Sequence, residues 1–207
     1  TCSSGTAALH LACLALGMNK DSVVVVPAIT NMASFFAPMY VGSTVISCDV
    51  CADSGLLDLE ALELICCNHN IHFVIAVHLY GHVVSSNHLA TLSKRYNFKV
   101  IEDCAEAHFA LNDDLINVGC SFDAGCFSFY ANKIVSAGEG GIVLFKDNSA
   151  ADIARNSKNL CFGSLGDPSK FYHHMIGFNY RMPALAAALA NACLDDLSSI
   201  LANRREI

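Results

Sequence analysis

The residues with chemical potential lie at the ends of expected helices and strands. Ser3-Ser4-Gly5-Thr6 stands directly before a helix-forming run, and the free amides and dipole at a helix N-terminus favour an anion such as phosphate. An ordinary serine N-cap explains the same residues. Glu102 and Asp103 end an apolar strand, where burying an unpaired carboxylate is costly. These two acids therefore fit either a catalytic or ligand-binding role or a loop.

Lys133 ends a second strand-like run, Phe-Ser-Phe-Tyr-Ala-Asn-Lys over residues 127–133. A lysine in apolar surroundings has a lowered pKa and becomes a nucleophilic amine that can form a Schiff base. A surface lysine at a strand end is the alternative. The glycine-rich segment 138–141 allows close backbone approach, but the Gly-Lys-Ser/Thr of a Walker loop does not follow it.

The order of these segments suggests one cofactor. Pyridoxal phosphate (PLP) needs a cradle for its phosphate, an acid paired with its protonated ring nitrogen, and a lysine that bonds to its aldehyde. The helix start at Ser4, the acid at Asp103 and the amine of Lys133 occur in the chain as three such groups.

The elements that would position these groups alternate between strands and helices. Continuous Val/Ile-rich strands predict a mainly parallel sheet covered on both faces, with reactive groups at the carboxyl ends of its strands. Helices are expected over residues 6–16, 58–66, 86–96 and 183 to about 201, and strands over 23–26, 41–47, 72–78, 98–103, 126–130 and 141–146.

Composition excludes several classes of protein. The 207 residues are 54% hydrophobic and 15% charged, which excludes a disordered chain and indicates one domain over residues 1–207. The net charge of −7, with no basic run, disfavours nucleic acid and anionic membranes as partners. Residues 22–48 carry no charge, but Pro27, Asn31 and Pro38 interrupt them, so we expect strand, loop, helix and strand there and no membrane span.

The 11 cysteines are expected to be reduced and mostly buried, which suits a cytoplasmic location. Only Cys48 and Cys51 have CxxC spacing, and no second pair or following histidine completes a metal site. The histidine pairs His69/His72 and His78/His82 also lack a third ligand. No metal is therefore predicted.

Four segments of the chain carry a family resemblance: Ser4–Leu11, Glu102–His108, Phe127–Lys133 with Gly138–Gly141, and Gly177–Met182. In this order they resemble the DegT/DnrJ/StrS-type nucleotide-sugar aminotransferases, which have the aspartate aminotransferase fold. Within that family the likeness is greatest to the GDP-perosamine synthase-like 4-aminotransferases. A related branch that dehydrates sugars carries histidine in place of the lysine, so Lys133 argues against that branch.

The resemblance implies a role for each matching residue. Lys133 would hold PLP covalently and shuttle a proton, and Asp103 would bond the pyridine nitrogen, which makes these two the catalytic residues. The other cofactor-binding residues would be Ser4, Gly5, Thr6 and Ser128 at the phosphate, Glu106 near the ring hydroxyl, Asn31 where relatives carry an aromatic ring or histidine, and Asn179 reaching the partner's phosphate in a homodimer.

The implied reaction transfers an amino group from an amino acid, usually glutamate, to a 4-keto-6-deoxy nucleotide sugar. The family's N-terminal segment and C-terminal small domain have no counterpart in residues 1–207, so we expect the PLP-binding large domain of a longer protein. A truncated or degenerate relative that binds cofactor or a partner without turnover is the alternative. A Rossmann-type reductase is set aside, because the chain lacks the G-x-G-x-x-G turn.

Overall fold

A computed structural model describes residues 1–162, 171–173 and 175–206. Its sheet has six strands in the order β2-β1-β3-β4-β5-β6, and every pairing is parallel except β5 with β6. The expectation of an α/β fold with a mainly parallel sheet is confirmed. The strands are β1 Val23–Pro27, β2 Thr44–Cys48, β3 Phe73–Val77, β4 Lys99–Asp103, β5 Ala124–Ser128 and β6 Gly141–Phe145.

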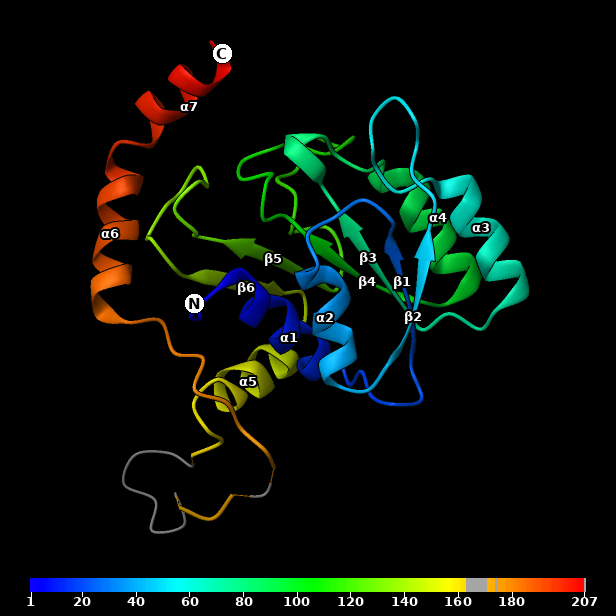
Figure 1. The fold of residues 1–207 in the computed structure, drawn as a ribbon, viewed down its shortest axis with the longest axis horizontal. Coiled ribbons are helices and arrows are strands. Elements are labelled where there is room, and N and C mark those ends of the chain that lie inside the picture. The colour runs from blue at the N-terminus through cyan, green and yellow to red at the C-terminus, as the bar shows by residue number, and fades with distance from the viewer. Residues whose placement is uncertain (163–170, 174, 207) are drawn as a thin grey trace.

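Helices cover both faces of this sheet (Figure 1). α1 (Gly5–Ala15), α2 (Ala33–Tyr40) and α5 (Asn148–Ser157) pack on one face, and α3 (Leu59–Asn68) and α4 (Ser86–Tyr96) pack on the other. α6 (Ala184–Asp195) lies beside the β5–β6 edge, on the left in Figure 1, and α7 (Leu197–Arg205) follows it at the upper left, farther from the strands. A short 3₁₀ helix, Leu79–Gly81, follows β3.

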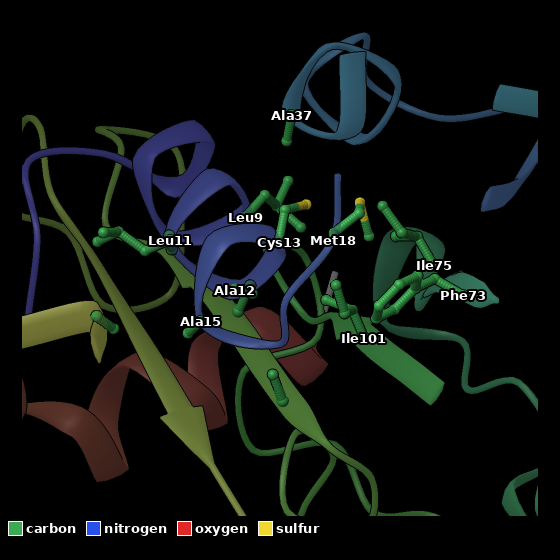
Figure 2. Packing of buried hydrophobic residues seen from close by; sticks show 14 of the residues in the cluster. Leu9, Leu11, Ala12, Cys13, Ala15, Met18, Ala37, Phe73, Ile75 and Ile101 are labelled. Carbon is green, nitrogen blue, oxygen red and sulfur yellow. The ribbon is translucent and has the colours of Figure 1, made fainter. Parts of the chain in front are cut away.

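The central strands are apolar because both of their faces are buried. All five residues of β3 are buried, as expected for a parallel strand between two helical layers. Figure 2 shows Leu9, Ala12 and Cys13 of α1 near strand residues such as Ile75 and Ile101. This packing fixes the N-terminus of α1 over the sheet.

Two elements differ from expectation. The single helix predicted after residue 183 is two helices, which meet at Asp196 with a bend of 70°. An acid is unfavourable at a helix C-terminus and favourable at an N-terminus, so the pair Asp195-Asp196 suits a helix boundary. α5 had not been predicted, although Asp147 caps it by accepting a hydrogen bond from the Ser149 amide at 3.1 Å.

The uncharged segment 22–48 forms β1, α2 and β2, as predicted. β2 starts three residues later than expected, because α2 runs to Tyr40 and Gly42 then adopts a positive φ of 82°. None of the described helices is by itself long and apolar enough to cross a membrane; α6 and α7 meet that test only jointly, as a bent pair.

Candidate active site

The N-terminus of α1 lies against the carboxyl end of β5. Ser4 caps the helix through its hydroxyl, which accepts a hydrogen bond from the Ala7 amide at 3.1 Å. A Cβ atom at Gly5 would lie 2.7 Å from Cβ of Ser128, so only glycine allows this close approach. The remaining amides of the first turn are available to an anion.

A cavity of about 390 Å³ opens at this edge of the sheet, a size suited to a small molecule. It brings together eight of the nine residues predicted for the site. They are Ser4, Gly5, Thr6, Asn31, Asp103, Glu106, Ser128 and Lys133.

Asp103, the last residue of β4, has its carboxylate in the cavity wall and is 5% exposed. One oxygen accepts a hydrogen bond from the Ser34 hydroxyl at 2.7 Å, and the other accepts one from the Ala105 amide at 3.1 Å. Burial raises the pKa of Asp103 above its ordinary value, against the opposing effect of these bonds and of nearby His78 and Lys133. A cationic N–H placed beside this carboxylate would favour its charged form.

Lys133 forms an ion pair with Glu106. The Lys133 ammonium lies 3.2 Å from one carboxylate oxygen of Glu106, and the other oxygen accepts a hydrogen bond from the Tyr80 amide at 3.1 Å. Tyr80 itself has a positive φ of 52°. The Lys133 side chain is 15% exposed, so it is neither a surface lysine nor fully buried.

Glu102 precedes Asp103 and has a different role. Its carboxylate accepts hydrogen bonds from the amides of Gly119, Ser121 and Phe122 at 3.0–3.3 Å, and it lies 3.3 Å from Nε2 of His78. His78, Glu102 and Cys104 offer potential metal ligands within 4.8 Å of one another, but these donors already occupy the carboxylate. We therefore interpret Glu102 as an acid that anchors a loop.

Two predicted site residues, Asn31 and Asn179, are exposed. Asn31 lines the cavity but is exposed, and its side-chain oxygen accepts a hydrogen bond from the Ala33 amide at 2.9 Å, at the start of α2. Asn179 is exposed and is not part of the lining, and its backbone pairs with that of Asn159.

Sequence reasoning missed several residues of the site. Ser34 bonds Asp103, yet it lies 69 positions away in the chain and its hydroxyl gives no signal in the sequence. Thr30, whose hydroxyl lies 2.9 Å from that of Ser34, also lines the cavity. Tyr80 contributes through its backbone, which no residue type reveals.

A profile of the DegT/DnrJ/EryC1/StrS aminotransferase family matches residues 1–207. The chain belongs to this family. GDP-perosamine synthase of Escherichia coli O157:H7 is 37% identical over 207 residues, which are 100% of this chain and 56% of that enzyme. The chain thus spans about half the length of this curated relative.

Solved structures of aminotransferases share the fold. An aminotransferase of Psychrobacter cryohalolentis superposes with a TM-score of 0.87 at 26% identity, over 96% of this chain and 52% of that one. A Streptococcus pneumoniae structure, described as the PLP form of a sugar aminotransferase, gives 0.85 at 25% identity, over 99% and 56%. The predicted family and fold are confirmed, and these relatives point to PLP as the cofactor.

The residues of this DegT/DnrJ-family chain fit PLP. Because Gly5 has no Cβ atom, the start of α1 with its first-turn amides lies directly against Ser128. Two donors from the described residues bond the carboxylate of the buried Asp103, which leaves it room to pair with a protonated ring nitrogen. The amine of Lys133 reaches the same cavity.

Proposed function

We propose that this chain is the PLP-binding part of an aminotransferase that transfers an amino group from an amino acid, glutamate in the first instance, to a 4-keto-6-deoxy nucleotide sugar. The observation that carries the proposal is the meeting of Lys133, Asp103 and the N-terminus of α1 in one cavity. The similarity to GDP-perosamine synthase supports the substrate class.

Bound PLP would supply an electron sink for breaking bonds at the amino carbon of the donor. The negative charge of Asp103 would keep the ring nitrogen protonated. Hydrogen bonds from Ser34 and the Ala105 amide hold this carboxylate in place. Gly5 and Ser128, with the amides of α1, would bind the phosphate and orient the ring. These residues would fix the cofactor without themselves moving protons.

Lys133 would carry the cofactor and then move the proton. Glu106 lies 3.2 Å from its amine, so this carboxylate would position Nζ of Lys133 in the cavity, where Nζ would take up and release the proton. Glu106 in turn is fixed by the Tyr80 amide.

We also propose a homodimer and a cytoplasmic location. Residues in and just before α2 expose apolar side chains of the kind that a partner subunit covers; these are Ile29, Met32, Phe36, Met39 and Tyr40, each 42–57% exposed. The exposed Asn179 is the residue proposed to reach the partner's cofactor phosphate. Free cysteines, most of them buried, suit a reducing compartment.

Turnover by the purified full-length protein tests this function. Incubation with PLP, glutamate and a panel of GDP- and dTDP-linked 4-keto-6-deoxy sugars should convert one ketone to the corresponding amine, detected by mass spectrometry. The Lys133→Ala variant should form no amine. Cofactor binding without an amine product from any keto sugar would contradict the proposal and favour a relative that binds PLP without turnover.

A further inference from the structure

The loop that carries Lys133 lacks regular secondary structure from residue 129 to residue 140. Within it, residues 132–136, which we name the lysine loop, have backbone groups bonded by side chains from elsewhere in the chain. We propose that His108, Cys193 and Arg204 are positioning residues that hold the lysine loop and thereby set the place of the Lys133 amine, an inference that rests on the role proposed above for Lys133.

The bonds to the lysine loop follow one another along the chain. Arg204 of α7 donates to the carbonyl oxygens of Asn132 and Lys133, at 3.2 and 3.4 Å. Cys193 of α6 donates to the Ile134 carbonyl at 3.4 Å and accepts from the Ser136 amide at 3.5 Å.

His108 provides the remaining side-chain hydrogen bond to the lysine loop. Its Nδ1 atom accepts a hydrogen bond from the Val135 amide at 3.3 Å. That bond requires Nδ1 to be unprotonated, so the ring is neutral, in keeping with burial that lowers the pKa of His108 to about 4. The ring packs edge-on against Phe127 and Phe129, which holds it in place.

Apolar packing adds to these bonds. Val135 and Ala137 form a small buried cluster with Ala186 and Ala190 of α6. α6 therefore contacts the segment after Lys133 through a thiol and through small apolar side chains. Figure 1 shows α6 beside the β5–β6 edge, next to this loop.

A device of this kind matters because catalysis depends on placement. A displacement of about 1 Å in a reacting group can cost about a hundredfold in rate. Within its own neighbourhood the Lys133 backbone makes one described hydrogen bond, which its amide donates to the Tyr130 carbonyl at 2.9 Å. The three positioning residues add to this restraint, together with the apolar packing.

The test uses the full-length protein loaded with PLP and compares paired variants. Cys193→Ala removes both thiol bonds, whereas Cys193→Ser can restore a donor and an acceptor. His108→Phe removes the acceptor for Val135, whereas His108→Asn offers an oxygen in its place. Arg204→Gln shortens the reach to the two carbonyls. Ser93→Ala is the control. It removes a comparable hydrogen bond, which the Ser93 hydroxyl of α4 donates to the Phe98 carbonyl at 2.7 Å, away from the lysine loop.

We expect Cys193→Ala and His108→Phe each to lower kcat by about three- to tenfold, the effect of one or two hydrogen bonds, with little change in KM. Cys193→Ser and His108→Asn should recover most of the loss, and Arg204→Gln should have the smallest effect because Arg204 is exposed. A kcat unchanged in the Ala and Phe variants, or lowered no more than in Ser93→Ala, would overturn the proposal.

A second measurement separates this inference from the proposed function. In cofactor-free protein, an amine-reactive ester should label Lys133 at a rate that changes in Cys193→Ala and His108→Phe but not in Cys193→Ser, with exposed Lys20 as the internal reference. This result is expected whether or not the enzyme turns over a sugar. Equal labelling of Lys133 in all variants would overturn the positioning role, whereas wild-type protein that binds no PLP would overturn only the proposed function.

Discussion

Glu102 and Asp103 are consecutive residues of β4 and are 1% and 5% exposed. Their carboxylates lie on opposite faces of the sheet and have different surroundings. On one side, three amides donate to the Glu102 carboxylate and His78 lies beside it. On the other, Asp103 receives two hydrogen bonds and lines a cavity. A fully bonded carboxylate stabilises a loop, whereas an incompletely bonded one is available to a ligand.

Replacement of Asp103 gives the largest expected effect. Asp103→Asn should lower turnover about a hundred- to a thousandfold, because the ring nitrogen loses its charged partner. The free energy of unfolding of the cofactor-free protein should not fall, since the variant removes a charge that burial disfavours. Steady-state kinetics and urea unfolding measure both quantities, with the exposed Asp21→Asn as control. Turnover within twofold of wild type would exclude Asp103 from the site.

Replacement of Glu102 should act on stability instead. Glu102→Gln turns an amide NH₂ group toward backbone N–H donors, so we expect the free energy of unfolding to drop by about 3 kcal/mol. Urea unfolding of Glu102→Gln beside the exposed Glu60→Gln gives the comparison. If Glu102→Gln were as stable as its control, Glu102 would not be an anchor.

The stability of the folded protein should depend on pH through His108. Its pKa is lowered to about 4, first by burial, so between about pH 6.5 and 4 the unfolded chain binds a proton that the folded chain does not. Stability should therefore fall as the pH decreases through this window, by at most about 1.4 kcal/mol per unit for this group. His10, whose pKa burial also lowers, adds a contribution of the same sign.

Urea unfolding at several pH values checks this dependence. His108→Phe should show a shallower slope than wild type below pH 6.5, whatever its stability at neutral pH. Identical slopes in the two proteins would mean that His108 is protonated as readily in the folded state as in the unfolded state.

Much of the fold could be predicted because the strands are strongly apolar. β1 and β3 combine Val/Ile-rich sequence with complete or nearly complete burial, and such runs fit few other structures. α5 was missed although its buried residues Ala150, Ala154 and Ser157 recur at helical spacing. The bend at Asp196 was not predicted, because the helix was predicted from its Ala/Leu content and the adjacent acids Asp195 and Asp196 were not considered.

Some residues of the site could likewise be predicted from the sequence, and others could not. That Gly5, Asp103 and Lys133 line one cavity could be predicted, because each stands at the end of an element and the topology brings these ends to one edge of the sheet. Ser34 and Cys193 could not, because their contacts join positions 69 and 57–59 residues apart and require the folded structure. The roles assigned to Asn31 and Asn179 stay predictions.

The central claim is that Lys133 binds PLP covalently in the cavity beside Asp103. Visible absorbance of the purified protein after PLP addition and removal of the excess, with Lys133→Ala beside it, tests this claim most directly. We predict a retained visible band in wild type and in the exposed control Lys20→Ala, and none in Lys133→Ala. An equal band in wild type and Lys133→Ala, or no band in well-folded full-length wild type, would contradict the account.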